Sequence, residues 1–360
     1  MHPHHGDGIT ASPSEPRPGP PSNGCIIMMN LALMNRFFQT VDTEGCCPIA
    51  DAFLERWSIN GPVRHQRSSE NFAWAIGDHD NATHFLRFNH ATERTVAGIE
   101  GEIAFVRHLA QSDLPVAQPV ISSAGHFVET VDTGLGTFHG SVFTALHGEE
   151  PDAEELDLPS LEHWGNLVAR VHQASEGFCV DGRPSWSEAI IKVRRTVPRD
   201  QVIVHRELDD VEQRLSSYAI TDPDYGLIHA DIDNCVWRDG AIDGIMDFDD
   251  CLYCWYEADI VSALVRLFDN RLDRINLEDE RLGAFLKGYR SIRGMPDEGI
   301  SRFPVFMRFG SLLTYGRTVW SLGSGAECEE SDWAAALRQA CKARLAQAAE
   351  EYERDPVAGF

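Results

Sequence analysis

Between Leu227 and Asp259 the chain reads LIHADIDNCVWRDGAIDGIMDFDDCLYCWYEAD. An apolar strand leads into a His-x-Asp sequence, an Asn follows, and a predicted hairpin with an Asp-Gly turn ends at another Asp. This order suits phosphoryl transfer, which depends on positioning and charge neutralisation more than on covalent chemistry. We therefore predict that Asp231 orients or deprotonates an acceptor hydroxyl, and that Asn234 and Asp247 hold Mg²⁺. A His-x-Asp sequence on its own would more often stabilise a loop.

This segment resembles the aminoglycoside phosphotransferase family, which shares the protein-kinase-like fold with choline kinases and homoserine-type kinases. The resemblance is carried by Leu227–Asp231, Asn234, Ile245–Asp250 and the aromatic-rich Cys251–Asp259, and it extends over residues 48–350. It implies an α+β, bilobal protein-kinase-like fold, with a small β-rich N-lobe and a larger, mainly helical C-lobe. It also implies an ATP- and Mg²⁺-dependent phosphotransferase that moves the γ-phosphate to a hydroxyl of a small molecule, such as an aminoglycoside, an amino-alcohol or a sugar-like compound.

The resemblance assigns nucleotide-binding roles to residues of the N-terminal half, namely Ser68, Ser69, Asn71, Arg87, Glu102, Thr144 and Leu146. The first three lie where the family places its nucleotide-covering loop, and the last two lie in a segment that resembles the adenine-binding hinge. Arg87 occupies the strand position of the phosphate-binding Lys, and Glu102 the helix position of its ion-pairing partner. From the residues alone, an ordinary turn, a solvent-facing Arg and a solvated helix face remain open alternatives, and Glu93 and Glu100 compete with Glu102 for the ion-pairing role.

The spacing within the central motif departs from the family pattern. Four residues separate the Asp from the Asn in the family, whereas here only Ile232 and Asp233 lie between Asp231 and Asn234. Two missing residues shorten the reach of an extended chain by up to about 7 Å. Either the upstream strand shifts so that Asp231 still reaches the acceptor, or His229 or Asp233 takes the base position. The alternative function is a nucleotide-binding pseudokinase with a shortened catalytic loop.

Composition and periodicity predict three segments. Residues 1–47, rich in Pro, Gly and Ser at their start, are expected to be a disordered or poorly ordered extension. Residues 48–146 form the predicted N-lobe, with helices at 49–57 and 93–109 and strands at 71–76, 83–88, 115–121, 126–131 and 140–145. Residues 147–352 form the predicted C-lobe, with helices at 161–174, 211–220, 260–269, 282–292, 303–321 and 333–352.

Charge and cysteine usage limit the partners. The formal net charge is −25, which disfavours nucleic acid and weakly favours a cationic acceptor. Apolar runs fall short of the length that spans a membrane. Nine scattered cysteines suit the reducing cytoplasm. We expect Cys251 and Cys254 to be small buried residues rather than zinc ligands, and we expect a monomer or a homodimer.

Other polar residues near the motif have less specific interpretations. Asp259 resembles a family position that supports the catalytic loop through hydrogen bonds, so we predict a structural role. Asp249 or Asp250 could contact the metal or the substrate. His172 lies on a predicted helix, where a buried core histidine is the favoured interpretation.

Overall fold

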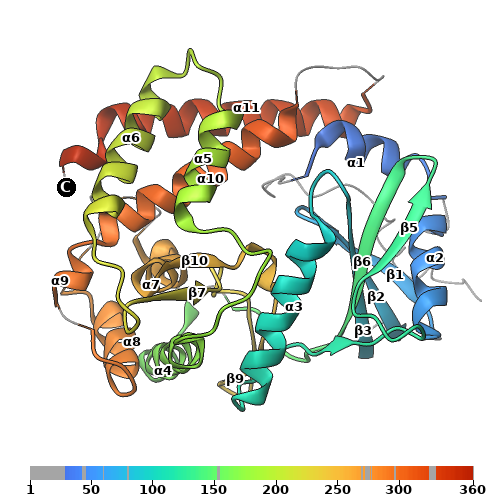
Figure 1. The fold of residues 1–360 in the computed structure, drawn as a ribbon, viewed down its shortest axis with the longest axis horizontal. Coiled ribbons are helices and arrows are strands. Elements are labelled where there is room, and N and C mark those ends of the chain that lie inside the picture. The colour runs from blue at the N-terminus through green and yellow to red at the C-terminus, as the bar shows by residue number, and fades with distance from the viewer. Residues whose placement is uncertain are drawn as a thin grey trace, which may run out of the picture.

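The computed structural model describes residues 29–42, 46–59, 61–78, 81–151, 155–268, 271, 276, 278–295, 297–323 and 330–359. Within this part of the chain a small sheet-containing lobe lies beside a larger helical lobe (Figure 1). The predicted α+β, two-lobed architecture is therefore confirmed. No helix in the described part combines the length and the hydropathy that crossing a bilayer requires.

The small lobe is built on one antiparallel sheet with the order β1-β2-β3-β6-β4, in which β5 also pairs with β6. Its strands are β1 (Val63–Ser68), β2 (Phe72–Asp78), β3 (Asn81–His90), β4 (Pro119–Val120), β5 (Glu129–Thr133) and β6 (Gly136–Thr144). Buried aromatic residues on alternating strand positions, including Phe72, Trp74 and Phe88, form the core beneath α2 (Pro48–Trp57). The sheet holds Arg87 opposite Ala73 on one neighbour and opposite Ser141 on the other.

A helix precedes this lobe, at a position where the sequence predicts a poorly ordered extension. Helix α1 (Leu31–Phe38) buries Leu31, Met34 and Phe37, and the Phe37 ring stacks on Phe72 with 3.8 Å between centroids. The prediction for 1–47 is therefore wrong for α1, because apolar residues spaced three apart give this segment a face that the sheet can bury. Residues 1–28 lie outside the described part of the chain. The boundaries proposed for the two lobes stay predictions.

The larger lobe is mainly helical. It contains α4 (Leu158–Ser175), α5 (Trp186–Thr196), α6 (Val202–Ser217), α7 (Tyr256–Leu264), α8 (Glu280–Arg290), α9 (Asp297–Ile300), α10 (Phe303–Leu322) and α11 (Asp332–Arg354), with short 3₁₀ turns η2 (Phe248–Asp250), η3 (Val265–Phe268) and η5 (Val357–Gly359). The predicted helices are present, with shifted ends. Helix α5 was not predicted, although its capping box, Ser185 with Glu188, is a recognisable start signal.

Two short strand pairs interrupt these helices and carry the central motif. Strand β7 (Tyr225–Ile228) pairs with β10 (Leu252–Trp255), and β8 (Cys235–Arg238) forms a hairpin with β9 (Ala241–Ile245). The predicted turn of this hairpin is present, with φ of 53° at Asp239 and 79° at Gly240. Backbone bonds tie the hairpin to both neighbours, from the Ile245 N–H to the Pro115 carbonyl at 2.9 Å and from the Trp237 N–H to the Glu149 carbonyl at 2.7 Å. The hairpin is thus fixed at the junction of the lobes.

Candidate active site

A buried hydrogen-bond network fixes the backbone that precedes Asp231. Asp259 on α7 is fully buried, and its two carboxylate oxygens accept hydrogen bonds from the His229 N–H at 2.9 Å and the Ala230 N–H at 2.6 Å. His172 on α4 donates from Nε2 to Asp259 at 3.1 Å, and its Nδ1 accepts from the Tyr289 hydroxyl at 2.9 Å. Burial lowers the pKa of His172, and a neutral imidazole supplies the one donor and one acceptor that these contacts need. Asp259 therefore supports the loop as predicted.

His229 points inward from the same segment. It is fully buried, its Nε2 donates to the Met246 carbonyl at 2.9 Å, and its Nδ1 accepts from the Asp231 N–H at 3.2 Å. Both ring nitrogens are thus occupied by backbone groups. The alternative in which His229 replaces Asp231 as the base is therefore not compatible with this geometry.

Positive φ angles occur at the residue before Asp231 and at Asp247, just after the β8–β9 hairpin. Ala230 has a φ of 72° and Asp247 a φ of 65°, a conformation that costs a non-glycine residue about 1–3 kcal/mol. Surrounding contacts must hold both residues in place, and the Asp259 network and the β8–β9 hairpin supply them. Strain of this kind is common where a backbone aims a functional side chain.

Asp231 and Asn234 are in direct contact despite the shortened spacing. The Asn234 side-chain amide donates from Nδ2 to Asp231 Oδ2 at 2.7 Å and to the Asp231 carbonyl at 3.0 Å. The Asn234 N–H donates to the same carbonyl at 3.3 Å, so the two residues close one tight turn. The pKa of the Asp231 carboxyl is raised by partial loss of hydration and then by the charge of Asp233, although the residue keeps an exposed surface. The turn is therefore two residues shorter than in the family, but its two predicted site residues, Asp231 and Asn234, stay in contact.

Asn234 and Asp247 lie at opposite ends of the β8–β9 hairpin, as predicted. The Met246 N–H donates to the Asn234 carbonyl at 3.1 Å, which brings the backbone of Asp247 next to Asn234. Because Nδ2 of Asn234 is turned to Asp231, its Oδ1 has no hydrogen-bond partner among the described residues. Amide and carboxylate oxygens are ligands that Mg²⁺ prefers, so this donor set fits the ion.

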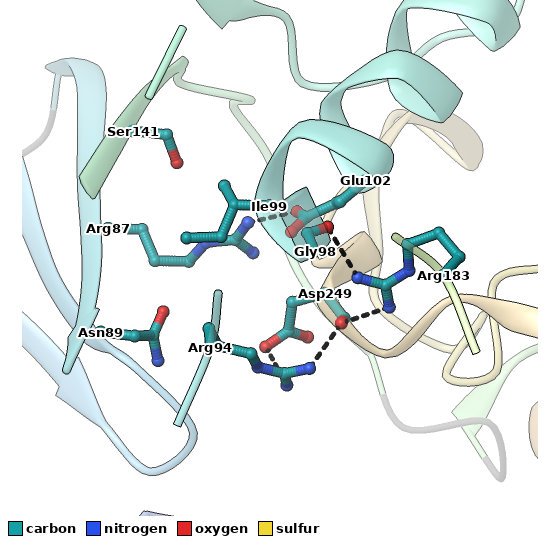
Figure 2. A pocket seen from close by; sticks show the side chains of 9 residues that line it. All are labelled: Arg87, Asn89, Arg94, Gly98, Ile99, Glu102, Ser141, Arg183 and Asp249. Carbon is teal, nitrogen blue, oxygen red and sulfur yellow. Dashed lines mark hydrogen bonds and ion pairs between the residues drawn. The ribbon is translucent and has the colours of Figure 1, made fainter. Parts of the chain in front are cut away.

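The predicted Arg87–Glu102 ion pair is present and reaches Asp247. The Arg87 guanidinium on β3 pairs with Glu102 on α3 (Val96–Gln111) (Figure 2). Its Nη1 also lies 3.2 Å from Asp247 Oδ1. These three side chains are 12%, 3% and 14% exposed, respectively. Burial alone would lower the pKa of Arg87, but Glu102 and then Asp249 hold it above its ordinary value. The structure thus joins residues from both lobes that are 160 positions apart.

Two arginines that the sequence analysis missed organise the η2 turn. Arg94 donates from Nη2 to Asp249 Oδ2 and Asp250 Oδ1, each at 2.8 Å. Arg183 donates to the Asp249 carbonyl at 2.7 Å and to the Cys251 carbonyl at 2.8 Å. Both arginines line a pocket together with Arg87, Asn89, Gly98, Ile99, Glu102, Ser141 and Asp249 (Figure 2). Asp249 and Asp250, which we expected near the metal or the substrate, therefore have arginine partners in this structure.

A third missed arginine comes from the far end of the chain. Arg317 on α10 pairs with both carboxylate oxygens of Asp250, and its Nη1 lies 3.6 Å from Oε2 of Glu70 in the β1–β2 turn. Burial alone would raise the pKa of Asp250, but Arg317 and Arg94 hold it below its usual range. Burial, then the charge of Asp250, raises the pKa of Glu70 well above its usual value.

The predicted nucleotide-covering loop forms the β1–β2 turn. Its residues Ser68, Ser69 and Asn71 are buried. Ser68 shares a 2.8 Å side-chain hydrogen bond with His65, and the Ser69 carbonyl accepts from the Met29 N–H at 3.1 Å. The turn therefore lies against the segment that leads into α1.

The predicted hinge follows β6. The Thr144 N–H donates to the Gln118 carbonyl at 2.8 Å, and the Thr144 hydroxyl accepts from the Gln118 N–H at 2.9 Å. The Leu146 side chain packs on Gly244 so closely that a Cβ there would lie 2.6 Å from it. Among the described residues, no hydrogen-bond acceptor is present for the Leu146 N–H. The hinge is thus fixed against β9, with one backbone donor available.

Comparisons with known proteins agree with this geometry. A family model described as the Phosphotransferase enzyme family matches residues 62–299. Amicoumacin kinase of Bacillus subtilis (strain 168) is 28% identical over 280 residues, which cover 74% of this chain and 83% of that protein.

Two solved structures are similar over most of the chain. Amicoumacin kinase hAmiN in complex with AMP-PNP, Ca²⁺ and Ami has a TM-score of 0.69 at 26% identity, over 86% of this chain and 93% of that chain. The microcompartment-associated aminopropanol kinase has a TM-score of 0.60 at 25% identity, over 85% and 97%. The family model spans the sheet, the hinge and the whole of the Leu227–Asp259 motif. The chain therefore belongs to the phosphotransferase enzyme family and has its two-lobed, protein-kinase-like fold.

Proposed function

We propose that this protein is an ATP- and Mg²⁺-dependent kinase that transfers the γ-phosphate to a hydroxyl of a small molecule. The observation that carries the proposal is that two contacting pairs, Arg87–Asp247 and Asp231–Asn234, are linked at the junction of the lobes by the hydrogen bond from the Met246 N–H to the Asn234 carbonyl. Membership of the phosphotransferase family and the likeness to two proteins named as kinases support it.

The metal and the phosphates would have a matching set of ligands at the junction of the lobes. Asn234 Oδ1 and the Asp247 carboxylate would hold Mg²⁺, which supplies charge neutralisation on the phosphate oxygens when it is bound. Arg87 would bind the phosphates through its planar guanidinium, and Glu102 would keep that group oriented. The contact between Arg87 and Asp247 at 3.2 Å supports this proposal, because phosphate binding and metal binding would then be adjacent.

Asp231 would orient the acceptor hydroxyl and accept its proton. The hydrogen bond from Asn234 Nδ2 fixes one carboxylate oxygen of Asp231, and the same carboxyl group is in hydrogen-bond contact with Asp233, a contact that the acceptor hydroxyl would replace. The two residues missing from the loop motivated the pseudokinase alternative. Because Asp231 and Asn234 stay in contact, we favour catalysis over nucleotide binding alone.

The nucleotide would lie between the β1–β2 turn and the hinge. Backbone N–H groups at Ser69 and Asn71 would cap the phosphates, with Ser68 supporting the turn. The N–H of Leu146 and the carbonyl of Thr144 would hydrogen-bond the adenine. The buried free thiols, including Cys251 and Cys254, fit a reaction in the reducing cytoplasm.

We propose an amine-bearing alcohol as the acceptor. Two relatives are named for amicoumacin and aminopropanol, and the chain carries a net charge of −25, which attracts cations. The test is ADP production by the purified protein with ATP, Mg²⁺ and a panel of amino-alcohols, aminoglycosides and sugars. We expect turnover with at least one amine-bearing alcohol and none after Mg²⁺ is chelated. Tight binding of Mg·AMP-PNP without turnover on any member of the panel would contradict catalysis.

A further inference from the structure

The β1–β2 turn, here Ser69–Asn71, is held from three directions. The Ser69 carbonyl accepts from the Met29 N–H at 3.1 Å, and the Glu70 carbonyl accepts from Asn89 Nδ2 at 2.9 Å. Both of these contacts come from the small lobe or its leading segment. The third comes from the helical lobe, where Arg317 Nη1 lies 3.6 Å from the Glu70 carboxylate. This contact ties the tip of the turn to α10.

The charges around Glu70 explain why this contact matters. One carboxylate oxygen each from Glu70, Asp249 and Asp250 lies within 4.8 Å of the others. Arg94 pairs with Asp249 and Asp250, while Arg317 pairs with Asp250 and Glu70. Burial and the charges of Asp250 and Asp249 raise the pKa of the Glu70 carboxyl, and Arg317 is the cation that opposes this effect, so without Arg317 an ionised Glu70 would face these like charges alone. Repulsion would then move the turn away from the η2 segment.

Helix α10 makes a second contact with the small lobe one helical turn further on. Trp320 lies three residues after Arg317, and so on the same side of α10. Its Nε1 donates to Glu93 Oε2 at 2.8 Å, while the other Glu93 oxygen accepts from the Asn30 N–H at 2.9 Å. Helix α10 thus contacts two carboxylates of the small lobe, Glu70 and Glu93. The Trp320–Glu93 contact holds α10 against the small lobe and so keeps Arg317 in position.

We propose that Arg317 is a positioning residue for nucleotide binding, which holds the β1–β2 turn closed over the phosphate site through Glu70. The idea rests on the proposed function, because it assumes that the turn covers phosphates. Backbone N–H groups can bind a phosphate only when the turn is held at the right distance. Arg317 acts through Glu70 and Asp250 and needs no contact with the nucleotide.

The first test is a double-mutant cycle on nucleotide affinity. Calorimetry would measure binding of Mg·AMP-PNP to the wild type, Glu70→Gln, Arg317→Gln and the double variant. Each single change should weaken binding about tenfold. The double change should weaken it no more than the single change with the larger effect, because both single changes remove the same Arg317–Glu70 interaction. Arg317→Lys should recover part of the affinity. Unchanged affinity in the single variants, or losses that multiply in the double variant, would overturn the proposal.

The second test needs no nucleotide and separates this inference from the proposed function. Amide hydrogen exchange of residues 69–73 in the nucleotide-free protein should become faster in Arg317→Gln and in Glu70→Gln. Arg194→Gln is the matched control, since Arg194 also bridges two carboxylates, Asp209 and Glu212, but within α5 and α6. Unchanged exchange in the turn would overturn the positioning role, whereas a wild type that binds no Mg·AMP-PNP would contradict the proposed function alone.

Discussion

The two sides of the His229–Asn234 segment are held in different ways. On its inner side, the Asp259 carboxylate accepts hydrogen bonds from the His229 and Ala230 N–H groups and is itself held by His172; Asp259 and His172 are both fully buried. The outer side of the segment carries Asn234, whose carbonyl accepts from the Met246 N–H, next to Asp247; Asp247 and its ion-pair partner Arg87 retain some exposure. The inner contacts have a full set of partners and little freedom. The outer ion pairs can exchange partners when phosphates and Mg²⁺ bind. We infer that the inner side determines stability and the outer side determines chemistry.

The largest effect is expected from a variant of Asp247, which tests the outer side of the His229–Asn234 segment. Asp247→Ala removes a predicted metal ligand and should lower ATP turnover by about 10³-fold or more. Its free energy of unfolding should fall by less than that of an inner-side variant, because Arg87 keeps its ion pair with Glu102. Steady-state ADP production and urea unfolding on the same preparation would check both values. Full turnover in this variant would show that the ion is held elsewhere.

The next effect concerns the inner side. Asp259→Asn keeps the shape of the side chain but places an amide donor opposite backbone N–H donors. We expect a loss of about 3 kcal/mol in unfolding free energy, since a buried carboxylate with several hydrogen bonds is replaced. Urea unfolding would measure it. A stability equal to that of the wild type would remove the distinction between the two sides.

A smaller effect is the pH dependence of the inner side. Burial lowers the pKa of His172 below its ordinary 6.5, so the folded state favours the neutral imidazole. The stabilisation of the folded state by neutral His172 is therefore fully present above pH 6.5. It is lost as the pH falls through this value toward the lowered pKa of His172 in the folded state. Urea unfolding should give His172→Gln a lower free energy of unfolding than the wild type at pH 7.5, and this difference should be smaller at pH 5.5. A difference that grows at the lower pH would indicate that His172 is charged in the folded protein.

The elements and residues that local pattern determines could be predicted from the sequence. Helical spacing located α2, α4 and α10, and the Asp-Gly turn located the β8–β9 hairpin. The meeting of Arg87 and Glu102 was predicted because a family pattern places them on adjacent elements. These features depend on periodicity, on turn chemistry or on a motif with fixed order.

Contacts between distant segments could not be predicted in this way. Arg94, Arg183 and Arg317 meet the η2 turn across 155, 66 and 67 positions, and an isolated arginine carries no signal of its partner. Helix α1 was missed because a low-complexity leader precedes it, although its apolar face was visible. The contraction of the Asp231–Asn234 turn was also beyond sequence reasoning, because spacing alone does not say how a shorter loop closes.

The most direct test of the account compares two carboxylates in the same turn. Asp231→Asn and Asp233→Asn each neutralise one of them with little change in shape. We predict that Asp231→Asn lowers ADP production by about 10²-fold or more and leaves Mg·AMP-PNP affinity unchanged, while Asp233→Asn retains most of the turnover. Full turnover in Asp231→Asn, with loss of turnover in Asp233→Asn, would contradict the assignment of Asp231 as the residue that orients and deprotonates the acceptor.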